Sequence, residues 1–233
     1  MLKKELILRN PLLQLGFETE DILPAGGFGA VLAHAGVGKT ALLVQLALNA
    51  MLRNRNVLHI SLNDPVNKVN LWYSELFHHL AGSYEGAQIN RLWELVLPHR
   101  FIMTFRVESF TVPKLKERLN DLTEQGIFSP AIMIIDGLHF DESLLADLND
   151  LKAMAAGTGM HAWFTVHTHR HESPGTDGLP PSFSAVAGLF DLVLELQPEH
   201  ADVHIKLLRG KESSPEGPEL LLDPSTMLIK NPI

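Results

Sequence analysis

Gly36, Gly38, Lys39 and Thr40 stand close together between an apolar run and a long helical pattern. Such a glycine-rich turn lets successive backbone N–H groups surround a phosphate, while the lysine neutralises the terminal phosphates and the threonine hydroxyl ligates Mg²⁺. Residues 33–40 fit a phosphate-binding loop at every position but the first, where Ala33 replaces glycine. Ala33 ends the preceding strand, so alanine is compatible with the loop if its φ stays negative. We therefore expect ATP to bind at these residues: Ala35, Gly36, Val37, Gly38, Lys39, Thr40 and Ala41.

Asp136 is the second residue placed for nucleotide chemistry, because it ends the apolar run of residues 131–135. A buried parallel strand presents a terminal carboxylate at its carboxyl edge, beside the phosphate-binding loop if the two strands are neighbours. There the carboxylate holds the water shell of Mg²⁺, and the Thr40 hydroxyl belongs to the inner shell. Thr40 and Asp136 are therefore the predicted metal residues, with an aspartate that merely caps a turn as the alternative.

Strands and helices alternate along most of the chain, which predicts an α/β fold. Apolar runs predict strands over residues 28–33, 56–62, 101–105, 131–136 and 162–168. Helical spacing predicts helices over residues 41–52, 66–80, 113–125 and 143–156, the last of them ended by Gly157. Short runs at residues 192–196, 203–208, 219–222 and 227–229 predict a C-terminal antiparallel extension of the sheet. We expect a mostly parallel central sheet flanked by helices, in a single domain over residues 1–233.

The composition is ordinary for a globular protein, since 45% of the 233 residues are apolar and 20% are charged. Cysteine is absent, which excludes disulfides and a thiolate zinc site. The sequence has neither a leader pattern nor an apolar run of membrane-spanning length, so we expect a cytoplasmic protein without a membrane partner. The net charge of -8 disfavours nucleic acid as a partner, although a local basic loop is compatible with that total.

Together these motifs resemble the RecA-like ATPase core, particularly its DnaB-type replicative-helicase and KaiC-type clock-protein branch. The resemblance covers nearly the whole chain and rests on residues 33–40, 60–64, 134–139 and 207–211 with 215–217. It implies an ATPase that assembles into a homo-oligomeric ring or filament and drives a conformational change in a partner, either DNA or a protein. It also implies that Arg209 and Lys211 reach the γ-phosphate bound by the next subunit. Two solvated cations on a surface turn are the alternative.

Asn63 departs from the resembled family, in which a glutamate at this place polarises the attacking water. An amide positions water but cannot accept its proton. Asp64 follows directly and supplies a carboxylate after a small shift. We expect slow hydrolysis that depends on Asp64, with loss of hydrolysis as the alternative.

His167, His169 and His171 follow the predicted strand that ends near residue 168. The resemblance implies that a polar side chain here contacts the γ-phosphate region, and His167 is the predicted sensor. Residues two apart on an extended chain share a face, so the three histidines are also candidate metal ligands, although no carboxylate or thiol nearby completes a set. Solvated loop histidines are the third alternative. The predicted catalytic residues are Lys39, Asn63, Asp64, Asp136, His167, Arg209 and Lys211.

Trp72, Tyr73 and Phe77 recur at helical spacing. Aromatic side chains that stack on nucleic-acid bases are accompanied by basic residues, and only Lys68 lies nearby in the sequence. The aromatic residues are therefore interpreted as core or as a subunit contact.

Three functions are compatible with these patterns. The first is an oligomeric ATPase whose site is completed between subunits, and the second is a regulatory module that binds ATP without useful hydrolysis. The third is a small-molecule kinase, which is disfavoured because no arginine-rich lid is evident between His171 and Arg209. The missing glutamate at Asn63 is the argument for the second.

Overall fold

One mixed β-sheet forms the centre of the protein, which a computed structural model describes over residues 2–14, 23–82, 84–168, 175, 178–200, 202–210 and 220–230. The strands are β1 (Phe28–Ala33), β2 (Val57–Ser61), β3 (Arg100–Thr104), β4 (Ile132–Asp136), β5 (His161–His167), β6 (Leu192–Glu199), β7 (Asp202–Arg209), β8 (Leu220–Leu222) and β9 (Ile229–Lys230). Their order across the sheet is β3-β2-β4-β5-β1-β6-β7-β8-β9.

The sheet is parallel from β3 to β6 and antiparallel from β6 to β9. The parallel strands are long apolar runs because helices cover both of their faces. The predicted α/β fold, with a mostly parallel sheet and C-terminal antiparallel strands, is thereby confirmed. One detail differs, because β6 itself pairs in parallel with β1, and the antiparallel part begins only with β7.

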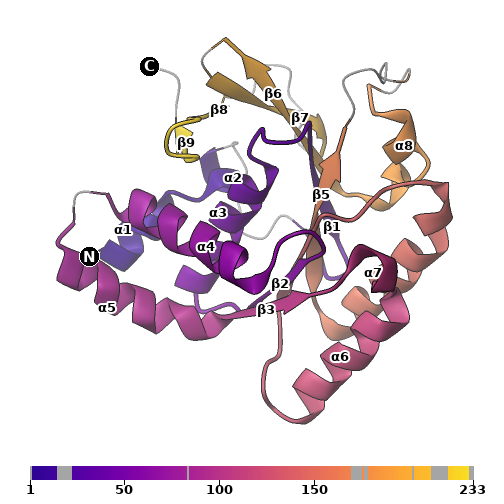
Figure 1. Cartoon of the computed structure of the whole chain (residues 1–233), viewed down its shortest axis with the longest axis horizontal. Helices are drawn as coiled ribbons and strands as arrows, with labels where there is room; N and C mark the ends of the chain where they lie inside the picture. The colour runs from indigo at the N-terminus through magenta and orange to yellow at the C-terminus, as the bar shows by residue number, and fades with distance from the viewer. Residues whose placement is uncertain are drawn as a thin grey trace.

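Helices lie on both faces of the sheet, with α1 to α5 on one side and α6 to α8 on the other (Figure 1). The α-helices are α1 (Leu2–Leu8), α2 (Pro11–Gln14), α3 (Lys39–Leu52), α4 (Val66–Ala81), α5 (Gly86–Val96), α6 (Val112–Glu124), α7 (Leu145–Thr158) and α8 (Pro181–Ser184). Short 3₁₀ helices are η1 (Leu97–His99), η2 (Val107–Ser109), η3 (Glu142–Leu144) and η4 (Ala187–Leu189).

Two hydrophobic cores lie against the two faces of the sheet. Successive residues of a strand point to opposite faces, so Ile134 joins the core beneath α3 and α4, whereas Ile135 joins the core beneath α6 and α7. The aromatic residues of α4 belong to the first core: Tyr73 and Phe77 are fully buried, and Trp72 packs against it partly buried. The structural interpretation of these aromatic residues is confirmed.

The end of α7 differs from its prediction. The helix continues through Gly157 to Thr158, and Gly159 adopts the left-handed conformation with φ +72°. A glycine just beyond a helix commonly takes this conformation, so the second glycine of the pair ends the helix. The sequence patterns also missed α1 and α5, which pack against the first core through Leu6, Ile89 and Leu92.

The carboxyl ends of β1, β2, β4 and β5 meet at one edge of the sheet, because these strands are adjacent and parallel. The predicted phosphate-binding loop follows β1, and Asp136 is the last residue of β4. The fold therefore places Lys39, Thr40 and Asp136 at the edge where open α/β sheets bind their ligands.

Candidate functional site

The loop between β1 and α3 has the backbone of a phosphate cradle. Gly36 and Gly38 adopt φ +79° and +117°, which side chains other than glycine rarely tolerate. A Cβ at Gly36 would meet no atom within 4 Å, so it would project into open space. A Cβ at Gly38 would stand 2.6 Å from Leu222 Cδ2, and together with the positive φ this contact favours glycine there. Ala33 is not among the described non-glycine residues with positive φ. Alanine at this position is therefore compatible with a phosphate-binding loop.

Helix α3 begins at Lys39 with Gly38 as its N-cap, and its first backbone bond runs from Leu42 N–H to Gly38 C=O. The first four N–H groups of a helix have no partner within the helix, and the helix dipole favours negative charge there. The loop and the helix start therefore provide a set of donors for an anion.

Asp136 is the centre of a hydrogen-bond network at the end of β4. Thr40 Oγ1 donates to Asp136 Oδ2 at 2.8 Å, and Thr165 Oγ1 donates to Oδ1 at 2.7 Å. The Thr165 hydroxyl also accepts a bond from the Gly137 N–H at 2.9 Å. The carboxylate is thereby fixed beside the first turn of α3, where the sequence predicted the two metal residues to meet.

Lys39 lies folded against its own loop. Its Nζ donates to the carbonyl oxygens of Ala33 and His34 at 2.7 and 2.8 Å. Burial lowers the pKa of Lys39 to about 8, and the Asp136 carboxylate opposes this shift. The ammonium is therefore pre-positioned at the mouth of the loop, and its charge is sensitive to mildly alkaline pH.

Asn63 and Asp64 occupy a turn that Ser61 holds in place. Ser61 Oγ donates to the Asp64 carbonyl at 2.9 Å and accepts from the Asp64 N–H at 3.0 Å. The Asp64 carboxylate pairs with Lys68 Nζ at 2.9 Å, and Lys68 is largely exposed. The side chain of Asn63 lies over Gly137. Asp64 is thus a carboxylate at the pocket that is held by an ion pair with an exposed lysine.

A pocket of about 650 Å³ brings most of the predicted residues together. Its lining residues are Ala35, Gly36, Lys39, Thr40, Ser61, Asn63, Asp64, Lys68, Val107, Asp136, Gly137, Leu138, His139, Thr165 and His167. Of the predicted loop residues, Val37, Gly38 and Ala41 do not line it: Val37 packs against the first core, and Ala41 is fully buried. These three residues contribute to the loop through their backbone and their packing.

His167 is the last residue of β5 and lines the pocket, in the place predicted for the sensor. His169 and His171 lie outside the described residues, as does Lys211. Within the described ranges, His, Asp and Glu side chains form no group of three or more that could hold a metal ion.

Arg209 lies far from the pocket of its own chain. It pairs with Val193 of β6, and Val193 pairs with Ala30 of β1, three residues before the strand ends at Ala33. At a rise of about 3.3 Å per residue, Arg209 stands roughly 10 Å below the edge at which the pocket opens. Its guanidinium donates to the Ala187 carbonyl.

The sequence patterns missed two residues that contact Asp136. Thr165 lies in β5, two residues before His167 and on the same face of the strand. The sequence signal that could have identified it was a polar residue within an otherwise mostly apolar strand. His59 lies in β2 with its Nε2 4.0 Å from Asp136 Oδ2, and it is fully buried. A histidine inside a continuous apolar strand was again the only signal.

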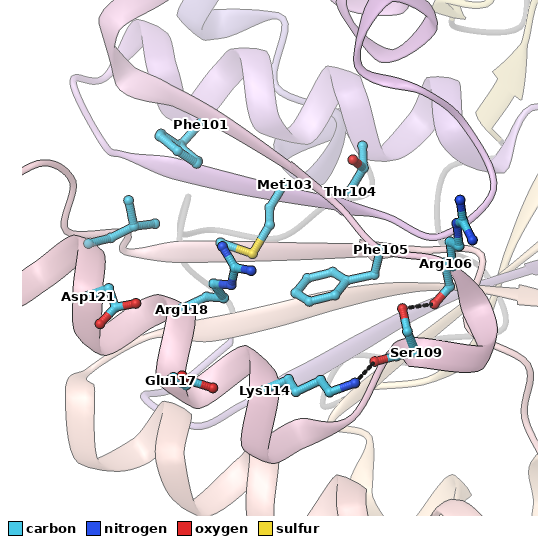
Figure 2. Close-up of a pocket in the computed structure, with 11 residues that line it drawn as sticks. Phe101, Met103, Thr104, Phe105, Arg106, Ser109, Lys114, Glu117, Arg118 and Asp121 are labelled. Carbon is cyan, nitrogen blue, oxygen red and sulfur yellow. Dashed lines mark hydrogen bonds between the residues drawn. The ribbon is translucent and has the colours of Figure 1, made fainter.

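A second cavity, of about 680 Å³, lies between edge strand β3 and helix α6. Figure 2 shows Phe101, Met103 and Phe105 pointing toward the helix, where Lys114 Nζ donates to the Ser109 carbonyl at 3.2 Å. The described residues that line it include none of those that line the first pocket. Its charges are mixed: Arg106, Lys114, Arg118, Glu117 and Asp121.

The first pocket fits a nucleoside triphosphate with Mg²⁺. Gly36 leaves open the space in which a phosphate would sit, and the loop supplies N–H donors and one ammonium. Thr40 and Asp136 offer the oxygen ligands that Mg²⁺ prefers. The residues of the pocket therefore suit both the phosphates and the Mg²⁺ ion.

The fold and the pocket define a P-loop NTPase-like protein. A family model described as an AAA domain matches residues 18–172, more than half of the chain, and the chain belongs to this family. The matched region includes the phosphate-binding loop, Asp136 and β5, and it ends before β6. Membership indicates a nucleotide-binding, ATPase-type function, since AAA-type P-loop domains generally bind ATP and Mg²⁺. No curated protein of similar sequence was found. Among the described residues, no helix combines the length and apolar character needed to cross a membrane.

Proposed function

We propose that the protein is an ATP-binding, RecA-like ATPase of the DnaB/KaiC-type branch, built as a single domain over residues 1–233. It binds ATP with Mg²⁺, hydrolyses it slowly, and couples this cycle to a conformational change within a homo-oligomer. The observation that carries the proposal is the bond from Thr40 Oγ1 to Asp136 Oδ2 at 2.8 Å, at the mouth of the phosphate-binding loop. This bond brings the two candidate metal-binding residues together from segments about a hundred residues apart in the chain.

Each residue of the pocket has a distinct part in this function. The N–H groups of the loop and of the first turn of α3 bind phosphate oxygens, and Lys39 turns from the Ala33 and His34 carbonyls toward the terminal phosphates. Thr40 holds Mg²⁺ directly, and Asp136 orients its water ligands; the ion neutralises charge on the phosphates when bound. Asp64 accepts the proton of the attacking water, and His167 contacts the γ-phosphate region.

Slow hydrolysis follows from the turn after β2. Asn63 orients a water but accepts no proton, and Asp64 must leave Lys68 to act as the base. A pure binding module is the second candidate function, and the asparagine at position 63 is the observation that favours it.

The position of Arg209 supports the proposed oligomer. Because Arg209 lies roughly 10 Å below the edge that carries its own pocket, it cannot complete that pocket in the same subunit. We expect it to act with Lys211 on the nucleotide of a neighbouring copy in a ring or filament. The acidic total charge disfavours nucleic acid as the driven partner, so a protein is the expected partner.

The test combines binding, turnover and size. Calorimetry with ATP and Mg²⁺ should give a saturable site that Lys39→Ala weakens about tenfold or more, because losing a charge-assisted contact costs ~1.5–3 kcal/mol. Steady-state turnover separates the two candidate functions: slow hydrolysis supports the ATPase, whereas binding without hydrolysis supports the module. Sizing by light scattering should show a larger species with Mg·ATP. Equal ATP affinity in the wild-type protein and Lys39→Ala would refute the assigned pocket.

A further inference from the structure

His59 is a fully buried polar side chain directly behind the candidate metal pair. It lies on β2, two residues before Ser61, and Ser61 pairs with Asp136 of β4. Alternate residues of a strand share a face, so His59 faces the side of the sheet that carries α3 and α4. Its Nε2 stands 4.0 Å from Asp136 Oδ2, the oxygen that also accepts the Thr40 hydroxyl.

Helix α4 fixes the other ring nitrogen of His59. The Tyr73 hydroxyl lies 3.1 Å from His59 Nδ1, and both side chains are buried. Burial raises the pKa of Tyr73, so its hydroxyl keeps a proton to donate. When the hydroxyl donates to Nδ1, the remaining proton of a neutral imidazole is on Nε2, on the side of Asp136.

The His59 imidazole is fully buried behind Asp136. Its Nε2 has no hydrogen-bond partner among the described atoms. A buried donor without a partner costs about 1–3 kcal/mol, so its retention beside Asp136 requires an explanation. A movement of about 1 Å by the Asp136 carboxylate would bring the pair into hydrogen-bond range.

The cluster continues from His59 and Tyr73 to Arg100, the first residue of β3. The Arg100 guanidinium lies 4.5 Å from the centre of the Tyr73 ring, and its NH2 group donates to Asn70 Oδ1 at 2.6 Å. Tyr73 and Asn70 both belong to α4, the helix that follows the Asn63–Asp64 turn. The same buried cluster therefore holds β2, β3 and α4 together behind Asp136.

We propose that His59 is a positioning residue for Asp136: its Nε2–H donates to Asp136 Oδ2 in the Mg·ATP-bound protein, and Tyr73 sets the tautomer that makes this possible. The inference rests on the proposed function, and it assigns a new residue to the same site. A group that orients a metal-binding carboxylate typically contributes 10- to 100-fold to metal affinity or activity. His59 touches neither nucleotide nor metal, so it acts only through Asp136.

Two amide substitutions separate the two contacts of His59. In His59→Gln the amide nitrogen takes roughly the place of Nε2, whereas in His59→Asn the side-chain amide reaches only the place of Nδ1. We expect His59→Asn to weaken Mg²⁺-dependent ATP binding about tenfold, with metal-free ATP binding changed less than about twofold. His59→Gln should restore most of the loss. Tyr73→Phe removes only the hydroxyl and should give an intermediate loss, because the tautomer is then no longer fixed.

Matched controls exist for both residues. His161→Asn removes another buried imidazole, at the start of β5, four residues before Thr165 and on the same face. Tyr84→Phe removes the hydroxyl of the other tyrosine of the chain, which bonds to Glu5 instead. Neither control should alter the ratio of metal-dependent to metal-free affinity. If His59→Asn also leaves this ratio at the wild-type value, His59 is only a core residue and the proposal is wrong.

A measurement on the wild-type protein tests the tautomer without substituting His59. In the free protein, nitrogen-15 NMR of the imidazole should show the Nε2–H tautomer, and its Nε2 signal should shift when Mg·ATP binds. The Nδ1–H tautomer, or an Nε2 signal that does not change when Mg·ATP binds, would overturn the proposal. Conversely, the Nε2–H tautomer in a protein that fails to bind Mg·ATP would refute the proposed function and leave the contact between Tyr73 and His59 intact.

Discussion

Asn63 lies directly against Gly137, the residue that follows Asp136. A Cβ at Gly137 would stand 2.3 Å from Asn63 Nδ2, and the φ of Gly137 is +93°. The turn after β2 and the turn after β4 are therefore packed together without room for one methyl group. This contact holds the amide at position 63 beside Asp136 of the candidate metal pair, while the neighbouring Asp64 faces Lys68.

Gly137→Ala should therefore displace Asn63 and destabilise the fold. The substitution introduces a residue at positive φ, which costs of order 1–3 kcal/mol, and adds the clash with the amide. Gly126→Ala is the matched control, because its φ is +64° and a Cβ there would meet no atom within 4 Å. Denaturant unfolding should show a larger loss for Gly137→Ala, and combining it with Asn63→Ala should recover part of the difference. Equal losses at the two glycines would contradict the packing argument.

Asp64 rather than Asn63 should supply the base for hydrolysis. Asp64→Asn keeps the shape of the side chain and its bond to Lys68 but removes the proton acceptor, so turnover should fall about 100-fold or more while ATP still binds. Asn63→Ala should lower turnover by less. Asp150→Asn, an exposed carboxylate on α7, is the charge-matched control. Turnover by Asp64→Asn at the wild-type rate would exclude Asp64 as the base.

Asp136→Asn should reduce the dependence of ATP binding on Mg²⁺. The amide keeps one oxygen for Thr40 or Thr165 but loses the charge that orients the waters of the ion. We expect the affinity gained by adding Mg²⁺ to fall about tenfold, with metal-free affinity unchanged or slightly raised. Calorimetry at several Mg²⁺ concentrations measures both values. An unchanged response to Mg²⁺ would mean that Asp136 only caps its turn.

Much of the site is predictable because its residues carry their information locally. The glycines, Lys39 and Thr40 are recognisable from their spacing, and Asp136 is recognisable because an acid ends an apolar strand. Parallel strands then bring their carboxyl ends to one edge, so two motifs about a hundred residues apart meet without further information.

The remaining residues were missed because their role depends on contacts between elements. In the sequence, His59 is one polar residue within a buried strand, and only the packing of α4 places Tyr73 against it. Thr165 gains its role from the pairing of β4 with β5. Likewise, helix α7 could have ended at Gly157 or at Gly159, and it ends at the one that takes positive φ. The spacing of the sequence does not specify which of the two glycines does so.

The affinity for ATP should decrease as the pH rises through about 8. Burial lowers the pKa of Lys39 to about 8, so the free protein loses this charge in mildly alkaline solution. Phosphate favours the charged amine and raises its pKa in the complex, so binding above that pH takes up a proton. We expect constant affinity below pH 7 and a fall of at most about tenfold per pH unit above pH 8. Calorimetry in buffers of different ionisation enthalpy measures the proton uptake.

Lys39→Ala provides the control for this pH dependence, because it has no amine at position 39 to titrate. Its weaker binding should be flat between pH 7 and 9. If the wild-type protein also binds with constant affinity and without proton uptake over this range, the amine is not the titrating group that contacts phosphate.

Hydrolysis should require Arg209 and Lys211 from a neighbouring subunit. Arg209 is at the far end of β7 from its own pocket, so we expect its cation to serve a nucleotide in another copy of the chain. A cation supplied in trans contributes roughly 10³-fold or more to phosphoryl transfer. Turnover per subunit should therefore rise with protein concentration until assembly saturates. Lys206→Ala, on the same strand, is the control for removing an exposed cation.

Mixing two inactive proteins gives the sharpest form of this prediction. Arg209→Ala/Lys211→Ala keeps an intact pocket, and Lys39→Ala keeps intact cations, so mixed assemblies contain some complete sites. Turnover should reappear on mixing and should peak near equal proportions of the two proteins. Because Arg209 also donates to the Ala187 carbonyl, circular dichroism must first show that the double variant is folded. Folded proteins that assemble together yet recover no turnover would show that the site is not shared between subunits.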